Sequence, residues 1–350
     1  MQREIIQEKD LPTISILIIA WNVERTLKKV LDSINIQTYP QKKIEILLID
    51  GNSTDRTHEI AKQSKIPVRI IQSKFPKDPE ACRGYGIPFA KNEILAFLDA
   101  DNFMPHKNWL RRMMVPLIKH KELYGVQSLR YAYRKKDALL NKYFALLGSA
   151  DPVGFYLKKD DRLSYLYDFN EWNLYGKIYK RFKEYFLIEF DTKHFPTLGC
   201  NGFFFRKRIV KKLKFTPQNF FHIDSPLDLA RMGYNKYAIV NEEIIHDTAG
   251  SFLGFLRKRA RYMRLHYVIR SNKRRYKVFD PSRGEDVYNL GKFIFFSITF
   301  VEPLIFSIRG YLKKRDSAWF IHPIFCFSIF ITYSIMVMMG LVQAQMHKKK

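Results

Sequence analysis

The first hundred residues alternate between short apolar runs and segments whose apolar residues recur at helical spacing. The apolar runs are rich in β-branched residues, as buried strands are, and they cover residues 13–21, 43–50, 68–73 and 93–99. Between the first two runs, "NVERTLKKVLDSINIQ" (22–37) carries the apolar spacing of an amphipathic helix. This alternation of strand and helix predicts an α/β domain with a mostly parallel sheet and flanking helices.

Two of the predicted strands end in carboxylates. The second ends on Asp50, and the fourth runs directly into Asp99-Ala100-Asp101. Ligands of such sheets bind at the carboxyl ends of the strands. Two neighbouring carboxylates repel each other unless a cation lies between them, and Mg²⁺ or Mn²⁺ is held by one or two carboxylates together with substrate phosphate oxygens. The pattern therefore indicates a metal site, and the alternative is a solvated turn.

The hydrophobic pattern changes towards the C-terminus. "FIFFSITFVEPLIFSI" (293–308) is apolar apart from Glu302, and residues 319–342 contain no Asp, Glu, Lys or Arg over 24 positions. The second stretch exceeds the roughly 20 residues that cross a hydrocarbon core. The first is short for a span and contains Glu302-Pro303, which favours a re-entrant or interfacial helix. We expect membrane attachment, with one or two crossings, rather than two buried helices of a soluble domain.

Charge and cysteine content narrow the choice of binding partner and cellular compartment. The chain has 60 Lys and Arg against 34 Asp and Glu, a formal charge of +26, which suggests an anionic partner such as nucleic acid, a membrane surface or a phosphorylated substrate. A basic run at 257–277 favours a cytoplasmic face for the chain before it. Cys82, Cys200 and Cys326 are widely spaced, which indicates a reducing compartment, and the polar first residues carry no signal-peptide pattern.

Five stretches have the order and spacing of a known family. They are "SILIIAWNVERTLKKVLDSINIQTYP" (15–40), "EILLIDGNSTDRT" (45–57), "ACRGYGIPFAKNEILAFLDADN" (81–102), "GCNGFFFRKRIVKKL" (199–213) and "DLARMGY" (228–234). Together they resemble the inverting family 2 glycosyltransferases with the GT-A fold, over roughly residues 13–250. The resemblance implies a Rossmann-like GT-A domain, a nucleotide-diphosphate sugar as donor, metal-assisted transfer and inversion at the anomeric carbon.

The same resemblance implies a pocket for the nucleotide base. Asp50 would accept the imino hydrogen bond of a uracil or guanine, and Glu24 and the backbone around Ala20 would flank the base. Each has a simpler interpretation. Asp50 is also typical of turn chemistry, and Glu24 of a first-turn carboxylate that complements a helix dipole.

The resemblance also assigns the diphosphate end of the donor. Arg83 would offset phosphate charge, unless it is a solvated surface cation. In the Asp99-Ala100-Asp101 turn, Asp99 would face the ribose or the metal and Asp101 would hold the Mg²⁺ or Mn²⁺. The cation would stabilise the departing nucleotide.

Inversion requires a base that removes the acceptor's hydroxyl proton. The family usually places a Glu-Asp pair shortly before a stretch such as "DLARMGY", and here the Glu is missing from "FFHIDSPLDLARMGY" (220–234). Asp224 is the first choice, His222 is the rival, and Asp228 is expected to face solvent or cap a helix. His246 matches a position where related enzymes carry a histidine near the metal, although a structural histidine is nearly as compatible.

These expectations combine into a domain plan. Residues 1–250 form the GT-A catalytic domain, with a helical and aromatic insertion at 130–195 on the acceptor side. Residues 251–290 form a basic amphipathic juxtamembrane region, and 291–346 form membrane-associated helices.

The expected activity is transfer of a sugar from a UDP- or GDP-sugar to a lipid-linked, for instance polyprenyl-linked, or nascent glycan acceptor at the membrane. The catalytic domain would lie on the cytoplasmic face. One alternative is an inactive membrane protein that binds sugar nucleotides, which the missing Glu before Asp224 keeps open. The other, a basic nucleic-acid-binding protein, leaves Asp50 and the Asp99–Asp101 turn unexplained, so no nucleic-acid partner is expected.

Overall fold

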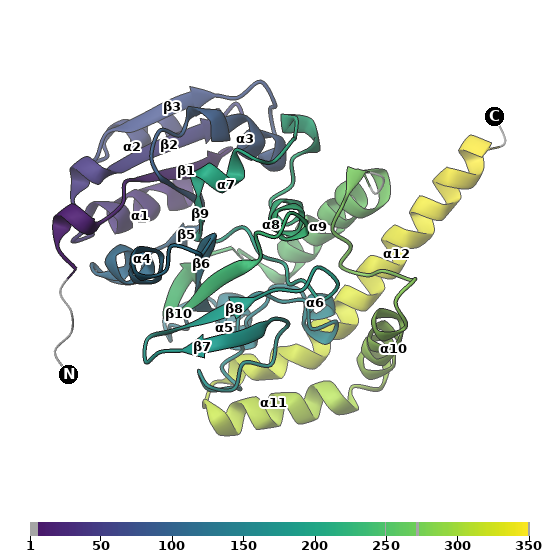
Figure 1. Ribbon diagram of the computed structural model, residues 1–350. Helices are drawn as coiled ribbons and strands as arrows, with labels where there is room; N and C mark the ends of the chain where they lie inside the picture. The colour runs from purple at the N-terminus through teal and green to yellow at the C-terminus, as the bar shows by residue number, and fades with distance from the viewer. Residues whose placement is uncertain (1–5, 249, 271–272, 349–350) are drawn as a thin grey trace. The chain divides into compact units, whose positions relative to one another are not determined.

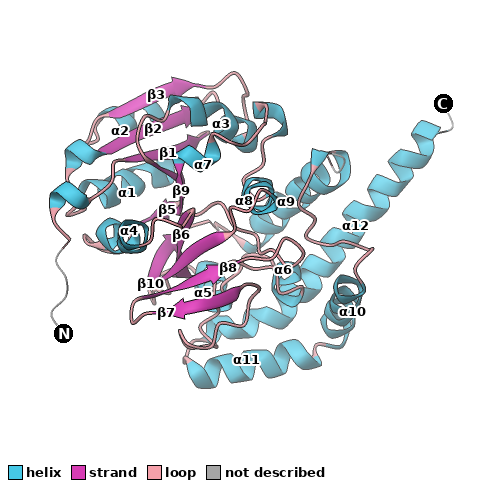
Figure 2. Ribbon diagram, viewed as in Figure 1, coloured by secondary structure: helices cyan, strands magenta, loops and turns pink. Residues whose placement is uncertain are grey.

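The computed structural model describes residues 6–248, 250–270 and 273–348, and the chain divides into two compact units. The first unit runs to Ala132 and resumes over Tyr175–Asp247, and the second comprises Tyr133–Leu174 and the chain from Thr248 onward. Figure 1 shows the course of the chain, and Figure 2 separates helices from strands by colour. Of the expected insertion, residues 133–174 group with the C-terminal part of the chain, whereas residues 175–195 belong to the first unit.

The first unit is built on a ten-stranded sheet in the order β3-β2-β1-β4-β9-β6-β10-β8-β7, with β5 paired to β10 off this path. The strands are β1 (Ile14–Ala20), β2 (Ile44–Asp50), β3 (Val68–Gln72), β4 (Ile94–Asp99), β5 (Asn102–Phe103), β6 (Gly125–Tyr131), β7 (Lys177–Arg181), β8 (Tyr185–Glu189), β9 (Phe203–Arg206) and β10 (Lys236–His246). The four strands predicted from the apolar runs are confirmed as β1 to β4. They pair in parallel, as predicted.

Beyond β4 the sheet is mixed. Strand β9 runs antiparallel to both β4 and β6, whereas β6 and β10 are parallel and β8 and β7 follow in antiparallel pairing. The first unit also carries α4 (Trp109–Lys119), α7 (Lys207–Val210) and α8 (Asp224–Arg231), and short 3₁₀ turns at Glu8–Asp10, Gln41–Lys43, Ile87–Phe89 and Pro217–Asn219. The sheet is therefore parallel where the donor motifs lie and mixed where the later motifs join it.

Helix α1 (Glu24–Asn35) buries the side that its apolar spacing predicts, with Leu27, Val30, Leu31 and Ile34 almost fully covered. Burying side chains of this size contributes about 1.5–3 kcal/mol each to the free energy of unfolding. Strand β2 is followed by a loop and then by the short helix α2 (Thr57–Lys62).

Helix α3 (Pro79–Gly86) carries Arg83. Asp78 caps it by accepting a hydrogen bond from the backbone nitrogen of Ala81 at 3.1 Å, and Pro79 occupies the first turn, where a missing N–H costs nothing. The helix lies tightly on the sheet at Gly86, where a β-carbon would fall 2.6 Å from Ile49. This start places both Glu80 and Arg83 on the buried side of the helix.

Every regular element in the described part of the second unit is helical (Figure 2). The helices are α5 (Leu139–Leu147), α6 (Pro152–Tyr156), α9 (Phe252–Met263), a π-helical continuation (Arg264–Ile269), α10 (Gly284–Thr299), α11 (Val301–Lys313), a 3₁₀ turn (Ser317–Ile321) and α12 (His322–Lys348). Their common core is aromatic, with Phe144, Trp319 and Phe325 buried. Gly310 permits this packing, because a β-carbon there would lie 2.4 Å from the Trp319 ring.

The C-terminal helices carry the apolar stretches of the sequence. Among the described residues, one stretch, Ser317–Leu341, is helical, long and apolar enough to cross a membrane. Helices α10 and α11 pass the same test only as a pair, and they meet at an 84° bend. Many large apolar side chains of these helices are exposed, for example Phe295, Leu304, Ile324 and Met338.

Candidate active site

The register of the parallel strands brings the predicted donor-site residues to one edge of the sheet. Ala20 at the end of β1 lies opposite Asp50 on β2, and Ile19 lies opposite Asp99 on β4. Strand β1 lies between the other two, so the strand ends that carry Asp50 and Asp99 are about 10 Å apart. This edge is the one at which ligands of parallel sheets bind.

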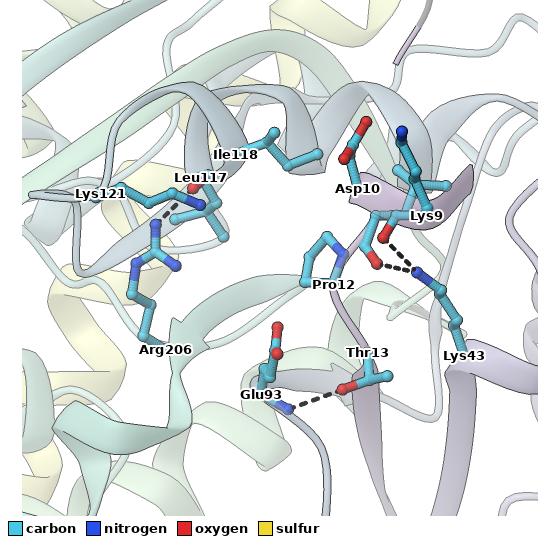
Figure 3. Close-up of a pocket in the computed structure, with 11 residues that line it drawn as sticks. Lys9, Asp10, Pro12, Thr13, Lys43, Glu93, Leu117, Ile118, Lys121 and Arg206 are labelled. Carbon is cyan, nitrogen blue, oxygen red and sulfur yellow. Dashed lines mark hydrogen bonds between the residues drawn. The ribbon is translucent and has the colours of Figure 1, made fainter. Parts of the chain in front are cut away.

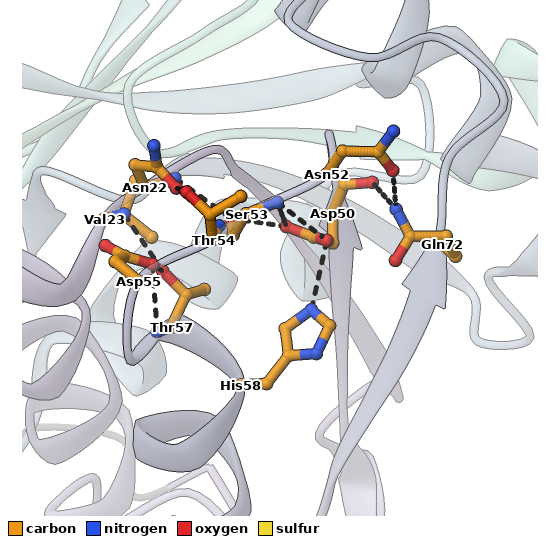
Figure 4. A network of polar contacts seen from close by, with 10 residues as sticks. All are labelled: Asn22, Val23, Asp50, Asn52, Ser53, Thr54, Asp55, Thr57, His58 and Gln72. Atoms are coloured by element: carbon orange, nitrogen blue, oxygen red, sulfur yellow. Dashed lines mark hydrogen bonds and ion pairs between the residues drawn. The ribbon is translucent and has the colours of Figure 1, made fainter.

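The carboxylate of Asp50 is fully buried and organises the loop that follows it (Figure 4). The backbone nitrogen of Ser53 donates to both of its oxygens, at 3.1 and 3.2 Å, and the Ser53 hydroxyl donates to Oδ1 at 2.6 Å. The ring nitrogen Nε2 of His58 lies 3.0 Å from Oδ2. Asp50 thus does stabilise the turn that follows it. A nucleotide base that bonds to Asp50 must displace one of these partners.

The same loop explains why Ser53 and Thr54, which have the residue types of helix N-caps, do not cap α2. Thr54 donates its backbone N–H to Asn22 Oδ1 at 2.8 Å, and Asp55 instead receives the backbone N–H of Glu24 at 3.0 Å. Helix α2 begins only at Thr57. Hydrogen bonds therefore hold the loop against the start of α1.

Glu24 and Ala20 both hold this loop. Glu24 opens α1, and its half-exposed carboxylate accepts hydrogen bonds from the Arg56 backbone nitrogen at 3.3 Å and from Arg56 Nε at 3.4 Å. The carbonyl of Ala20 accepts the backbone N–H of Gly51 at 2.7 Å. Ala20 therefore lies opposite Asp50, and Glu24 contacts the loop that follows Asp50.

Arg83 is the centre of a buried charge cluster. It is 3% exposed, so the interpretation as a solvated surface cation is wrong. Its Nη1 lies 2.8 Å from Glu80 Oε1, and its Nη2 lies 2.5 Å from Asp99 Oδ1. Burial opposes the charge on Arg83, but the neighbouring Glu80, Cys200 and Asp99 outweigh it and hold the pKa well above its ordinary value. Arg83 therefore stays a cation.

Cys200 completes the surroundings of Asp99. Its thiol donates to Asp99 Oδ2 at 2.7 Å, and burial raises the pKa of the thiol well above its ordinary value, so the proton stays on sulfur. Because Arg83 takes Oδ1, both oxygens of Asp99 have protein partners. Cys200 reaches this position from the "GCNG" turn, in which Gly199, Asn201 and Gly202 all have positive φ.

Asp101 and His246 come together through the short strand β5. This strand pairs antiparallel with the end of β10, with Asn102 opposite His246, and the backbone nitrogen of Asp247 donates to the Asp101 carbonyl at 2.9 Å. As a result, His246 Nε2 lies 3.6 Å from Asp101 Oδ1. Both side chains are partly exposed, whereas Ala100 before them is buried.

The donor set of Asp101 and His246 fits a divalent cation. A carboxylate oxygen and an imidazole nitrogen are both ligands of Mn²⁺-type ions, and the second ring nitrogen of His246, Nδ1, is buried without a hydrogen-bond partner among the described residues. Asp99 fits less well, because its oxygens are engaged. Across the described residues, no group of three or more His, Cys, Asp or Glu side chains could hold a metal, so substrate oxygens would have to complete the site.

On the acceptor side, the two candidate bases differ in exposure. Asp224 is the first residue of α8 and is fully buried, whereas the His222 side chain is 13% exposed. His222 Nδ1 lies 2.8 Å from Glu80 Oε1, and the backbone nitrogen of His222 donates to Glu80 Oε2 at 2.9 Å. Asp228 lies 3.4 Å from Arg231 on the same helix.

Glu80, Cys200 and Asp247 are the residues of this region that sequence reasoning missed. Glu80 lies three positions before Arg83, a spacing that brings side chains together on a helix, and this was an available signal. Asp247 accepts ion pairs from Arg25 and Lys29 of α1, each at 3.3 Å. That pairing links segments more than 200 positions apart, and nothing in the local sequence indicates it.

A pocket of about 460 Å³ lies at the opposite edge of the sheet (Figure 3). Thr13 and Glu93, which line it, immediately precede β1 and β4, so the pocket faces the amino ends of these strands. Two of its cations already bond to the backbone, Lys43 to Leu11 at 2.5 Å and Arg206 to Leu123 at 2.7 Å. The Asp50–Asp99 edge therefore stays the candidate active site.

Comparison with known proteins finds a family whose model covers the donor-site motifs. The family model described as "Glycosyl transferase family 2" matches residues 15–213, which include both Asp50 and the Asp99–Asp101 turn. Glycosyltransferase AglE of Haloferax volcanii is 37% identical over 105 residues, which are 29% of this chain and 34% of that protein.

A second relative is the UDP-Glc:alpha-D-GlcNAc-diphosphoundecaprenol beta-1,3-glucosyltransferase WfaP of Escherichia coli. It is 34% identical over 91 residues, 26% of this chain and 36% of that protein. The matches thus span only about a third of the length of these curated relatives.

The fold has a solved counterpart. The mannosyltransferase PcManGT from Pyrobaculum calidifontis, determined with GDP-Man and Mn²⁺, superposes with a TM-score of 0.52 at 13% identity. The match covers 92% of this chain and 87% of that one, which supports the GT-A-like architecture predicted from the sequence.

Proposed function

The chain belongs to glycosyl transferase family 2, and from this premise we propose that it transfers a sugar from a UDP- or GDP-sugar to a lipid-linked or nascent glycan acceptor, with inversion at the anomeric carbon. The observation that carries the proposal is the convergence of Asp50 and the Asp99–Asp101 turn at one edge of the β2-β1-β4 sheet. That edge lies within the segment that matches the family.

In the proposed complex, the nucleotide base lies against Ala20, Glu24 and Asp50. The base donates its imino hydrogen to Asp50 and takes the place of either the Ser53 hydroxyl, which donates to Oδ1, or the His58 ring, whose Nε2 lies 3.0 Å from Oδ2. Arg83 holds Asp99 towards the ribose and diphosphate and adds positive charge behind them. This arrangement accepts uracil and guanine, which both carry an imino hydrogen.

Asp101 and His246 are the residues that would hold the divalent cation, Mg²⁺ or Mn²⁺. When bound, the cation neutralises charge on the departing nucleoside diphosphate. The pair Asp101 Oδ1 and His246 Nε2, 3.6 Å apart, supports this role, as does the Mn²⁺ that accompanies GDP-Man in the PcManGT complex.

The acceptor is proposed to be membrane-linked. The apolar stretch Ser317–Leu341 and the exposed apolar side chains of α10 and α11 support attachment to a bilayer, and the name of WfaP specifies a diphosphoundecaprenol-linked acceptor. The basic run at 257–277, which precedes the apolar segments, supports placing the chain before it on the cytoplasmic face. The positive charge also suits acceptors and lipids that carry phosphate.

The test is transfer of radiolabel from UDP-glucose, UDP-N-acetylglucosamine and GDP-mannose by membranes that contain the full chain. We expect one donor to label lipid or glycan, and Asp101→Ala to abolish the labelling. Calorimetry with UDP and GDP is the second measurement. If none of the donors is transferred but UDP or GDP binds more strongly with Mn²⁺, the donor site is intact and the membranes lack the right acceptor. Absence of both binding and transfer would refute the proposed function.

A further inference from the structure

We infer that His222 is the base that takes the acceptor's hydroxyl proton, and that Glu80 is its positioning residue. The inference rests on the proposed function, because it concerns the acceptor side of the same transfer. It replaces Asp224, the base expected from the sequence, with a histidine whose carboxylate partner comes from a different segment of the chain.

Glu80 determines which ring nitrogen of His222 carries the proton. The charge of Arg83 and the hydrogen bonds from His222 outweigh the effect of burial and hold the pKa of Glu80 well below its ordinary value, so Glu80 is an anion that only accepts hydrogen bonds. Nδ1, at 2.8 Å from Glu80 Oε1, must therefore be the N–H donor. In the neutral ring, Nε2 then has the lone pair that a base needs.

Nε2 is available for an acceptor. It has no hydrogen-bond partner among the described residues. It is also not among the fully buried polar atoms, so a hydroxyl group can reach it. Asp224, two positions later, has no exposed surface in this structure. A base must come within hydrogen-bond distance of the hydroxyl it deprotonates, so exposure favours His222.

Three contacts fix His222. Glu80 holds both its ring and its backbone nitrogen, and the ring stacks on Phe221 with centroids 5.1 Å apart. Behind its carbonyl lies Gly199, where a β-carbon would be 2.3 Å away. The position of the ring is therefore set by packing as well as by charge.

The same contacts connect His222 to the donor site. Glu80 bonds to Arg83 at 2.8 Å and Arg83 to Asp99 at 2.5 Å, so one hydrogen bond and two ion pairs in succession join the imidazole to the strand end that faces the donor. The "GCNG" turn supports both ends of this series, with Gly199 beside His222 and Cys200 bonded to Asp99. A base and a donor site on one rigid network are held at a constant separation.

The transfer conserves atoms and electrons without a further reactant. The acceptor oxygen forms a bond to the anomeric carbon of the donor sugar as its hydroxyl proton passes to Nε2 of His222. The bond between that carbon and the phosphate oxygen breaks, and the electron pair leaves with the nucleoside diphosphate. The imidazolium that forms is stabilised by the Glu80 carboxylate and afterwards returns its proton to water.

The first test compares His222→Asn with Asp224→Asn in the full chain. Asparagine at 222 keeps an N–H near the position of Nδ1, which preserves the bond to Glu80 and removes only Nε2. We expect the turnover rate to fall by about 100-fold or more while nucleotide binding is unchanged. Asp224→Asn should retain turnover within a few-fold, and loss of turnover in Asp224→Asn with turnover retained in His222→Asn would overturn the inference.

The second test is the pH dependence of turnover. The titratable groups that face His222 directly or through Glu80 are Glu80 and Arg83 of α3, with Asp99 and Cys200 behind them. A histidine side chain ordinarily titrates about two pH units or more above a carboxylate, so a histidine base gives its acid limb at the higher pH. A limb only in the ordinary range of carboxylates would contradict the assignment.

Glu80→Gln tests positioning. We expect turnover to fall at least tenfold with the donor KM unchanged, and Glu80→Asp to restore part of the loss. Equal losses in both variants, in step with their stability, would show a structural role only.

A third measurement does not depend on turnover. Nitrogen-15 NMR of the histidine-labelled chain, assigned with His222→Asn, should show neutral His222 protonated at Nδ1. The Nε2-protonated form would overturn the inference even if no donor is found. Failure of transfer in the wild-type chain with the expected tautomer present would instead count against the proposed function.

Discussion

The thiol of Cys200 donates a hydrogen bond to Asp99 Oδ2 at 2.7 Å, on the side of the carboxylate opposite Arg83. Asp99 is thereby fully engaged by the protein, although it stands in the motif that suggested a metal site. Asp101, two residues on, instead faces His246. The two carboxylates of the motif therefore have different surroundings: Asp99 is held by Arg83 and Cys200, whereas Asp101 lies beside His246, where the proposed function would have it hold a cation.

This contrast predicts different behaviour for Asp99→Asn and Asp101→Asn. Asp101→Asn should remove the strengthening of nucleotide binding by Mn²⁺, because it removes a charged ligand, and the free energy of unfolding should change by less than about 1 kcal/mol. Asp99→Asn should retain a response to Mn²⁺ but lower the free energy of unfolding by about 3 kcal/mol, since Arg83 loses a buried partner. Calorimetry with and without Mn²⁺ and urea unfolding measure the two effects.

Asp32→Asn is the matched control, because Asp32 lies on α1 in an exposed pair with Lys28. It should change neither quantity. A nucleotide complex whose Mn²⁺ response survives Asp101→Asn but not Asp99→Asn would reverse the assignment.

Acid should weaken the fold through Glu80. Its folded pKa is held well below the ordinary value of 4.5, so its contribution is complete above pH 4.5 and is lost as the pH falls below that value. The free energy of unfolding should therefore decline below pH 4.5, with Glu80 adding at most about 1.4 kcal/mol per pH unit to the slope. Glu80→Gln should have a shallower slope between pH 4.5 and 3 in denaturant unfolding, whatever its stability at pH 7. Equal slopes would mean that folding does not lower the pKa of Glu80.

Gly199→Ala should damage both stability and turnover. Its φ is +115°, and the new β-carbon would lie 2.3 Å from the carbonyl of His222, so the backbone of the candidate base must move. Gly233 has a φ of +86° but no atom within 4 Å of a β-carbon, so Gly233→Ala isolates the conformational cost of about 1–2 kcal/mol. We expect Gly199→Ala to cost more than Gly233→Ala in thermal unfolding and to lose turnover. Similar losses in the two variants would argue against the close contact.

The second unit has its own matched pair of glycines. Gly310→Ala places a β-carbon 2.4 Å from the buried Trp319 ring and should lower the free energy of unfolding by about 1–3 kcal/mol. Gly291→Ala, on α10 with no atom within 4 Å of the β-carbon, should raise it by up to about 1 kcal/mol through helix propensity. Unfolding of the full chain in detergent, followed by tryptophan fluorescence, checks both signs. A destabilised Gly291→Ala would contradict the open surroundings of Gly291.

The sequence predicted the parallel part of the sheet well because its information is local. Each of β1 to β4 is a short apolar run followed by a helix, and the register then follows from the strand ends. The approach of Asp50 to Asp99 needed only the rule that parallel strands end at one edge. The mixed part was not predicted, since the antiparallel insertion of β9 depends on pairing with strands about 75 and 110 positions earlier.

In the candidate site too, local sequence features were predicted and long-range contacts were not. Asp50, Asp99 and Asp101 were identified from strand ends, but the burial of Arg83 and the partnership of Glu80 with His222 were not. Those contacts join α3 to a loop 142 positions away, and only the folded chain brings them together. For the same reason, exposure could not decide between Asp224 and His222 before the structure was known.

The place of β9 in the sheet has a consequence for biosynthesis. Strands β4 and β6 are complete in the chain by residue 131, yet β9, which lies between them, ends at Arg206. A ribosome that adds about 5–20 residues per second leaves their facing edges unpaired for several seconds. Unpaired edges are templates for aggregation, so the nascent chain should depend on chaperones most strongly in that interval, until the last strand between them emerges.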